Sequence, residues 1–371
     1  MAEWKKVRLG TIVSTNQDTY SPKENWKFVN YLDTGNITMN RIDEVQHINT
    51  SMDKLPSRAR RKVKSNSIIY STVRPNQLHY GIIKEQPENF LVSTGFTVID
   101  VNMEKAVPDY IYYVLTQKEI TEHLQAIAEQ SVSAYPSLKP SDIENLEVLL
   151  PDIDTQKATV AILGVIDEKI KQNTEINKNL KQQAQAIYQQ MFITNRNPNW
   201  KNGLLSDLVA VRYGKDHKKL KDGVYPVYGS GGIMRYVEKP LYTGESVLIP
   251  RKGTLNNVMY VNGAFWSVDT MFYTEMLRSN VAKFVYHFVK SKDLASMNAG
   301  SAVPSMTTNI LNAMQLYIPD NEILSTFEEI VSPMYSQMQE NEKQSKKLAD
   351  LRDTLLPRLM SGKLDISEIE F

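Results

Sequence analysis

The most regular hydrophobic pattern in the chain is a seam of residues spaced alternately by three and four positions, and it occurs twice. The first seam lies in a proline-free stretch, 154–192, and consists of Leu163, Ile166, Ile170, Asn173, Asn177, Leu180, Ala184, Ile187 and Met191. The second consists of Val331, Met334, Met338, Asn341, Ser345, Leu348, Arg352, Leu355 and Leu359. This spacing predicts two long amphipathic helices, the first of ~39 residues and about 58 Å.

Each predicted helix has a narrow apolar stripe that a long partner has to cover, and the other helix is the obvious partner. The polar Asn173 and Asn341 weaken such a seam but fix its register. The alternative is that each helix packs only on its own globule, although a globule rarely covers ten helical turns. Pro333 lies inside the second seam, so the second helix is expected to begin or kink there.

Motifs outside the helices also occur twice, in the same order. The segment 133–137 reads SAYPS and 301–305 reads SAVPS, an offset of 168 (133 to 301) that also relates Asn173 to Asn341. Near the start of each copy, Trp4 matches Trp200 at an offset of 196 (4 to 200). The first copy therefore holds about 28 more residues (196 less 168), and the chain is predicted to run globule, helix, globule, helix.

Both globules are predicted to mix short strands and helices, which makes the fold α+β. The β-branched runs 67–72, 96–101 and 246–250 predict strands. Residues 108–130 predict a helix, with 280–297 as its counterpart. The expected boundaries are a globule over 1–150, a helix over 151–194, a globule over 195–318, a helix over 319–363 and a tail over 364–371.

Composition and charge narrow the function. Hydrophobic residues make up 42% and charged residues 23%, as in ordinary globular domains. The net charge of +1 excludes a basic coat over the whole protein but permits a local basic face. Cysteine is absent, which excludes disulfides, thiolate zinc sites and a cysteine nucleophile. The first ten residues lack an apolar stretch and the longest uncharged apolar run is 158–166, so a cytoplasmic protein is expected.

Two basic clusters stand out against the neutral total. The first consists of Lys54, Arg58, Arg60, Arg61, Lys62 and Lys64, with no acidic residue among them. The second consists of Arg212, Lys215, Lys218, Lys219 and Lys221, with Asp216 inside it. One such cluster is often only a solvated face. Because one occurs in each half of the chain, contact with phosphates is the favoured interpretation.

A search for catalytic motifs leaves the chain without a reaction of its own. The five histidines have no metal-ligand spacing, and HExxH, GxSxG and EF-hand patterns are absent. The glycine-rich stretch 225–233 is neither a Walker loop nor a dinucleotide fingerprint. Asp152, Asp167 and Lys169 imitate a nuclease signature, but the last two lie in a predicted helix instead of paired strands. The Asn/Asp-Pro-Pro-Tyr/Phe segment of amino-methyltransferases is also absent, so a binding or scaffolding protein is expected.

Several segments resemble the specificity subunit of type I restriction–modification systems, and the resemblance covers essentially the whole chain. They are YPVYGSGG at 225–232, LIPRKGT at 248–254, SIIYSTVRP at 67–75, the two Ser-Ala-x-Pro-Ser boxes, the hydrophobic-Pro box before each helix and the ending PRLMSGKL at 357–364. The family's Glu-Gln after that proline is Thr155-Gln156 in the first copy and Glu322-Ile323 in the second.

The resemblance implies two target recognition domains, each reading half of a split DNA sequence, and two long helices packed antiparallel. The helices then space the domains and dock two methyltransferase subunits for adenine N6 methylation. Restriction subunits are further partners, and S-adenosylmethionine, ATP and Mg²⁺ belong to the partner subunits. In an antiparallel pair with twofold pseudosymmetry, Asn173 and Asn341 are expected to lie close together with their amides paired.

The DNA-binding candidates follow from groove chemistry, in which arginine and lysine read guanine and asparagine and glutamine read adenine. The candidates for bases are Arg74, Asn76, Gln77, Tyr135, Lys252, Thr254, Asn256 and Asn257, with Tyr228, Ser230 and Arg251 in the neighbouring glycine-rich and Pro-Arg-Lys segments. The candidates for phosphates are Lys54, Arg58, Arg60, Arg61, Lys62, Lys64, Lys215, Lys218 and Lys219. The Ser and Pro residues shared by both boxes are expected to be structural or to contact phosphates.

Two other classes of protein remain open at this point. One is a methyltransferase or nuclease with its own recognition domain, and S-adenosylmethionine binding by the isolated chain would reveal a methyltransferase. The other is a coiled-coil protein with no role on DNA, and salt-dependent binding of duplex DNA would exclude it.

Overall fold

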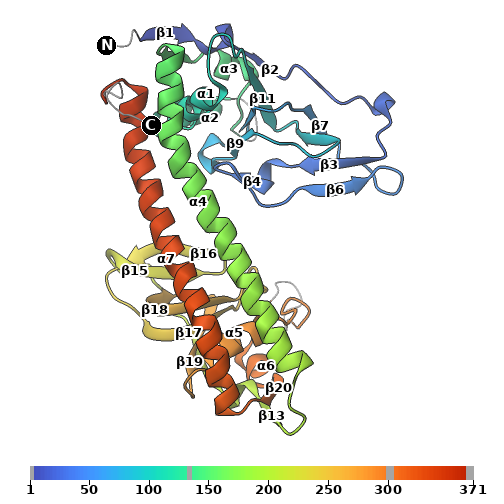
Figure 1. Ribbon diagram of the computed structural model, residues 1–371, viewed down its shortest axis with the longest axis vertical. Coiled ribbons are helices and arrows are strands. Elements are labelled where there is room, and N and C mark those ends of the chain that lie inside the picture. The colour runs from blue at the N-terminus through green and yellow to red at the C-terminus, as the bar shows by residue number, and fades with distance from the viewer. Residues whose placement is uncertain (1–3, 132–135, 298–304, 365–371) are drawn as a thin grey trace. The chain divides into compact units, whose positions relative to one another are not determined.

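The computed structural model describes residues 4–131, 136–297 and 305–364 (Figure 1). The chain forms two compact units. Unit 1 consists of Met1–Lys171 and Gln344–Phe371, and unit 2 consists of Gln172–Lys343. Each unit therefore combines one globule with a segment of each long helix.

Unit 1 is built on two four-stranded sheets, ordered β6-β3-β10-β7 and β2-β11-β8-β9. β8 (Ser67–Ser71) is central in its sheet and all five of its residues are buried, as expected for an apolar β-branched run. The other strands are β1 (Lys5–Arg8), β2 (Val13–Thr15), β3 (Phe28–Leu32), β4 (Ile37–Thr38), β5 (Arg41–Ile42), β6 (Gln46–Asn49), β7 (Ala59–Lys62), β9 (Tyr80–Ile83), β10 (Phe90–Ser93), β11 (Phe96–Val101) and β12 (Glu147–Leu150).

The helix predicted over 108–130 is instead two helices, α1 (Pro108–Leu115) and α2 (Lys118–Glu129). The break has a local cause at Thr116 and Gln117. Thr116 Oγ1 donates to the carbonyl of Tyr113 at 3.2 Å, and Gln117 Nε2 donates to the carbonyl of Val114 at 3.2 Å. These bonds satisfy carbonyls of the last turn of α1, so the helix ends there. A short helix, α3 (Pro140–Glu144), follows.

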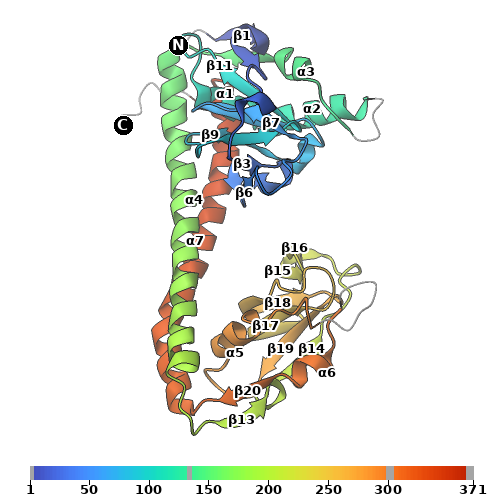
Figure 2. The same ribbon diagram turned by 90° about the vertical axis from the view of Figure 1, so that its right-hand side faces the viewer.

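Unit 2 contains one six-stranded sheet, ordered β14-β19-β17-β18-β15-β16. Its strands are β13 (Lys201–Leu204), β14 (Val209–Tyr213), β15 (Asp222–Gly229), β16 (Gly232–Val237), β17 (Tyr242–Pro250), β18 (Met259–Ser267), β19 (Met271–Met276) and β20 (Gln315–Ile318). The helix predicted over 280–297 is shorter, α5 (Ala282–Lys290), because Ser291 Oγ bonds to the carbonyl of Phe288 at its end. α5 contacts β17 and β18 (Figure 2), and α6 (Thr308–Asn312) precedes β20.

The strand pairing confirms the duplication in detail. β1 pairs antiparallel with β12, and β13 pairs with β20 in the same way. In each globule the first strand is therefore paired with the last. β3 pairs parallel with β10, as β15 does with β18. Equivalent residues of the two copies are 196 positions apart at β2 and β14 (13 to 209). They are 179 positions apart at β8 and β17 (67 to 246). The first 17 extra residues of unit 1 (196 less 179) therefore lie between β2 and β8.

Two long helices are present, α4 (Ile153–Tyr188), which continues in a π-helical turn (Gln189–Thr194), and α7 (Asn321–Met360). All the predicted seam residues are buried or half-buried. The expectation that the second helix begins at Pro333 is wrong, because α7 begins at Asn321. Leu324, Phe327 and Val331 are buried in the core of unit 2, and this packing offsets the cost of about 3 kcal/mol for an internal proline.

Both proposed ways of covering the long helices are realised together. In unit 1, Leu163 of α4 and Leu356 of α7 lie in one core with α1. In unit 2, Tyr188 of α4 and Phe327 of α7 share a core with α5. Within each unit, the helix segments pair with each other and also pack on the globule.

The expected contact between Asn173 and Asn341 is confirmed, but the expected pairing of their two amides is wrong. Asn173 Nδ2 donates to the main-chain carbonyl of Asn341 at 3.4 Å. The side chain of Asn341 pairs instead with Asn177, one turn further along α4, at 2.8 Å. Asn177 Nδ2 in turn donates to the carbonyl of Met338 at 3.1 Å. Two asparagines on successive turns of α4 therefore share one on α7.

Candidate nucleic-acid interface

Several turns of unit 1 converge at the end of β8. Thr72, just past β8, uses both its main-chain N–H and its hydroxyl to bond the carbonyl of Gly95, at 2.8 and 2.9 Å. The carbonyl of Thr72 accepts from the N–H of Leu138 at 2.7 Å. A side chain at Gly95 would meet Thr34 at 2.8 Å, so the turns after β3 and β10 approach closely here. The result is a rigid platform that carries the exposed Arg74 and its neighbours.

Unit 2 repeats this arrangement with other side chains. The carbonyl of Arg251 accepts from the N–H of Met306 at 2.9 Å, and the N–H of Arg251 donates to Thr270 at 2.8 Å. Gly253 has a φ of +84°, and a side chain there would meet Ser230 at 2.8 Å. Glycine is therefore required where the turn after β17 touches the turn after β15.

The two Ser-Ala-x-Pro-Ser boxes have a structural part in this platform. Ser137 forms an isolated β-bridge with Val73, and Ser305 forms the equivalent bridge with Lys252. The carbonyl of Pro136 also accepts from the N–H of Arg74 at 3.2 Å. These contacts support the structural role expected for the shared residues. Tyr135 and the shared residues Ser133, Ala134, Ser301, Ala302 and Pro304 lie outside the described residues.

The base-reading candidates of unit 1 are well placed to meet a ligand. Arg74, Asn76 and Gln77 are all exposed. Arg74 has a φ of +50°, a conformation that side chains seldom adopt, and it begins a 3-10 turn over Pro75–Gln77. Gln125 of α2 accepts from the N–H of Asn76 at 3.1 Å and holds this turn. A strained turn of this kind is typical of functional sites.

The structure divides the base-reading candidates of unit 2 into two groups. Lys252 and Thr254 are exposed. Asn257 Nδ2 donates to the carbonyl of Ser230 at 2.7 Å, and Asn256 bonds to Asp293 and to the N–H of Ala295, each at 3.1 Å. Both asparagine amides hold the turn together, so Lys252 and Thr254 become the stronger candidates.

Three further candidates pack partly against the protein. Tyr228 is half-buried with its ring 6.1 Å from that of Phe265, and burial raises the pKa of its phenol. The guanidinium of Arg251 lies 5.4 Å from the centre of the Tyr213 ring. Ser230 contributes its carbonyl to Asn257 and its side chain to the contact at Gly253.

The first basic cluster also divides. Lys54, Arg58 and Lys64 are exposed, whereas Arg60, Arg61 and Lys62 are half-buried on β7. Lys62 Nζ lies 2.7 Å from Glu24 and 3.8 Å from Asp18. The hydrogen bond to Glu24 raises the pKa of Lys62 and lowers that of Glu24. Lys62 is thus already neutralised within the protein and is the weakest phosphate candidate of the six.

The second basic cluster lies mainly on the connection between β14 and β15, where Lys215, Lys218, Lys219 and Lys221 are exposed. Trp266 Nε1 donates to the carbonyl of Lys215 at 2.8 Å, which fixes the start of this connection. Arg212, on β14, is bound to Glu275 at 2.9 Å. The lysines therefore form the solvent-facing part of the cluster.

Sequence reasoning missed one part of the platform. In unit 1 the turn Thr34–Asn36 follows β3, and it corresponds to the glycine-rich turn of unit 2 at the offset of 196 (34 to 230). Its segment LDTGNI at 32–37 matches YGSGGI at 228–233 only in its glycine and isoleucine and in a hydroxyl side chain. That match is the one signal that could have identified it.

The nuclease-like residues have structural roles instead. Asp152 accepts from the N–H of Thr155 at 2.8 Å at the start of α4, which is typical of a helix cap. Asp167 lies outside the predicted seam, yet it binds Arg352 of α7 at 2.8 Å. Within the described residues, no group of three or more His, Asp or Glu side chains is placed to hold a metal ion.

Comparison with protein families decides the relationship. The model of the type I restriction–modification DNA specificity domain matches residues 1–182 and again residues 197–349. The chain belongs to this family. It is thus a type I restriction–modification specificity subunit with two DNA recognition domains, as the resemblance implied.

Individual relatives agree with the family assignment. The specificity subunit of the type I restriction enzyme HindI from Haemophilus influenzae is 22% identical, with 98% of this chain and all of that protein covered. The MjaIX specificity subunit from Methanocaldococcus jannaschii is 22% identical over 74% of this chain and 73% of its own. The crystal structure of the S subunit from M. genitalium has a TM-score of 0.61 at 17% identity and covers 99% of this chain and 97% of its own, which shows the shared fold. Among the described residues, no helix has the length and apolar character needed to cross a membrane.

Proposed function

We propose that each recognition domain reads one half of a bipartite DNA target through its platform of convergent turns. The observation that carries this proposal is the repetition of one main-chain arrangement with different exposed side chains. Val73 and Lys252 occupy equivalent bridges, and Arg74 and Gly253 follow them at the same place in each turn. A main-chain arrangement that is shared by two domains but carries different side chains is suited to recognising two different DNA sequences.

The division of labour follows from exposure and pairing. In unit 1, Arg74, Asn76 and Gln77 read bases, together with Tyr135 of the preceding box. In unit 2, Lys252 and Thr254 read bases. The phosphate contacts come from the exposed lysines and arginines, namely Lys54, Arg58, Lys64, Lys215, Lys218 and Lys219, and from the half-buried Arg60 and Arg61 of β7.

The long helices serve as a spacer and a platform. Recognition domains over 1–150 and 195–318 are held by helices over 151–194 and 319–363, which dock two methyltransferase subunits for adenine N6 methylation and, with motor and nuclease subunits, restriction. S-adenosylmethionine, ATP and Mg²⁺ are held by those partners, and this chain contributes no catalytic group. The complex works in the bacterial or archaeal cytoplasm.

Exchange of one recognition domain tests the proposal. Residues 200–318 are replaced by the equivalent segment of a relative, and methylated adenines are mapped by sequencing in cells that carry the complete system. One half of the methylated sequence should change and the other half should stay. A simultaneous change of both halves would exclude the two-reader model, and S-adenosylmethionine binding by the isolated chain would exclude a non-catalytic subunit.

A further inference from the structure

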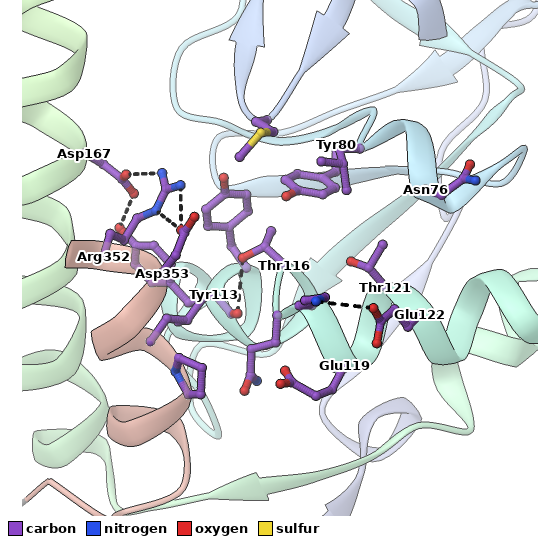
Figure 3. Close-up of a pocket in the computed structure, with 17 residues that line it drawn as sticks. Asn76, Tyr80, Tyr113, Thr116, Glu119, Thr121, Glu122, Asp167, Arg352 and Asp353 are labelled. Atoms are coloured by element: carbon purple, nitrogen blue, oxygen red, sulfur yellow. Dashed lines mark hydrogen bonds and ion pairs between the residues drawn. The ribbon is translucent and has the colours of Figure 1, made fainter. Parts of the chain in front are cut away.

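A pocket of about 470 Å³ lies in unit 1, between the recognition domain and the adjoining segments of α4 and α7 (Figure 3). Its walls come from α1, α2, the turn after β8 and short stretches of α4 and α7. Three tyrosines, Tyr80, Tyr112 and Tyr113, line it. Adjacent rings are close, with centroids 6.3 Å apart for the first two and 5.3 Å apart for the last two.

Carboxylates outnumber cations around this pocket. The acidic lining residues are Asp167, Asp353, Glu119 and Glu122, and the basic ones are Arg352 and Lys118, so the formal charge is −2 (four less two). Arg352 already binds Asp167 and Asp353, each at 2.8 Å. Tyr113 also donates to Asp167 at 2.7 Å. Aromatic rings beside excess negative charge favour a cationic ligand.

The internal repeat shows what occupies the corresponding place in unit 2. Tyr113 bonds to Asp167 of α4, and His287 bonds to Tyr335 of α7 at 3.0 Å. These pairs align α1 with α5 at an offset of 174 (113 to 287), which places Lys290 where unit 1 has Thr116.

Lys290 reaches into the turn after β17. Its ammonium group donates to the carbonyl of Asn256 at 3.0 Å, and burial lowers its pKa. Asn256 belongs to the counterpart of the turn that supplies Asn76 and Leu78 to the pocket of unit 1. In unit 2 an exposed lysine therefore bridges the helix and the turn, at the position where unit 1 has the shorter Thr116 beside its pocket.

Unit 2 also shows that this fold can hold a cation between carboxylates and tyrosines. Lys283 Nζ lies 2.8 Å from Glu245 and 2.5 Å from Glu328, and its side chain is only 5% exposed. The same ammonium group lies 5.1 Å from the centre of the Tyr260 ring and 5.6 Å from that of Tyr335.

We propose that the pocket of unit 1 binds one lysine or arginine side chain of a partner protein. The inference rests on the proposed function, because the methyltransferase subunit beside the first recognition domain is the partner taken to supply it. The inserted cation lies among the tyrosine rings and beside the carboxylate of Glu119. Glu122, which also pairs with Lys118 at 3.7 Å, and Asp353, which also pairs with Arg352 at 2.8 Å, add to the negative charge around it. The two docking positions of the duplicated chain then differ, since Lys290 stands in unit 2 at the position of Thr116.

The test introduces a lysine at the position that corresponds to Lys290 of unit 2. Full-length Thr116→Lys is mixed with the methyltransferase subunit of the same system, and stoichiometry and affinity are measured by native mass spectrometry and biosensor titration. The wild-type chain should bind two subunits, and the variant should bind one of them at least tenfold more weakly. Glu119→Gln/Glu122→Gln should weaken the same position, and it serves as the second variant if Thr116→Lys does not fold. Thr11→Lys, at an exposed position of the same unit outside the pocket, should bind as the wild type does.

The outcomes separate the pocket from the wider function. If the wild-type chain binds two subunits and the pocket variants bind them equally well, the pocket proposal is overturned and the docking function stands. If the wild-type chain binds none, both fail. Spermidine is titrated in parallel as a free polycation. Saturable spermidine binding that Thr116→Lys abolishes, with unchanged subunit binding, would assign the pocket to a small cation and overturn the protein partner.

Discussion

The side-chain amide of Asn341 donates a hydrogen bond to Asn177 at 2.8 Å inside the buried seam of unit 2. Both residues are less than one-tenth exposed. Asn341 Oδ1 also accepts from Gln337 at 2.8 Å, and Asn177 donates to Met338 on the opposite helix. The polar layer is therefore shared between α4 and α7, and a shift of one turn would separate its partners.

Removal of one member of this layer should destabilise unit 2. Asn341→Leu leaves the carbonyl oxygen of Asn177 buried without its donor, which costs about 1–3 kcal/mol of unfolding free energy in urea titrations. Asn177→Leu/Asn341→Leu should regain most of that loss because neither partner of this buried pair is then left without the other. Lys178→Leu, an exposed position on the same helix, is the control. If the unfolding free energy of the single variant equalled that of the wild type, the polar layer would make no contribution to stability.

His287 should make unit 2 sensitive to mild acid. Burial lowers the pKa of His287 to about 4 from its ordinary 6.5, and its neutral ring bonds Gln185 and Tyr335. The unfolded chain therefore takes up the proton first as pH falls, and stability declines from about pH 6.5 down to about pH 4. The full loss is about 3 kcal/mol.

Urea unfolding at several pH values checks this dependence. His287→Gln should flatten the profile between pH 6.5 and 4, whereas His47→Gln, an exposed histidine of unit 1, should leave it as it is. An equally steep profile in His287→Gln would assign the acid sensitivity to other groups.

The first basic cluster should contribute unequally to DNA binding. Arg60→Gln/Arg61→Gln should weaken binding to all duplexes and flatten the dependence of the logarithm of affinity on the logarithm of salt concentration by up to about one unit per lost phosphate contact. Lys62→Gln is a matched control, because Glu24 and Asp18 already neutralise Lys62. Fluorescence anisotropy at several salt concentrations measures both. Equal slopes in all proteins would place β7 away from the duplex.

The long helices should set the distance between the two halves of the target. One heptad inserted into both α4 and α7 lengthens each by about 10 Å, which corresponds to about three additional base pairs of spacer if the change transfers fully. Mapping of methylated adenines measures the new spacer. A spacer that stays the same after paired insertions would exclude the ruler.

The long helices were the most predictable part of the fold, because the period of a helix directly sets which side chains face a partner. The strands of the first unit between β2 and β8 were not predicted, since β4 and β5 have two residues each and give almost no periodic signal. The break at Thr116 depends on side chains that bond to their own helix. Propensity over a window of residues does not report such bonds.

The DNA-binding candidates show a second kind of limit. Sequence reasoning placed Asn256 and Asn257 beside Lys252 and Thr254, all in one turn. In the structure the two amides bond to Asp293 and Ser230, which lie far along the chain. Which side chains of a turn bond within the protein depends on those distant partners, and a single sequence does not identify them.

The core of unit 1 joins both ends of the chain, with consequences for its synthesis. Leu356, Leu359 and Met360 pack with residues from Leu9 to Leu163, whereas unit 2 is one continuous stretch, Gln172–Lys343. At roughly 5–20 residues per second, the ribosome needs about 10–40 s to pass from Leu163 to Leu356. The recognition domain that is translated first is therefore the last to complete its core. In a chain that ends before the last turns of α7, this core lacks the side chains that α7 supplies.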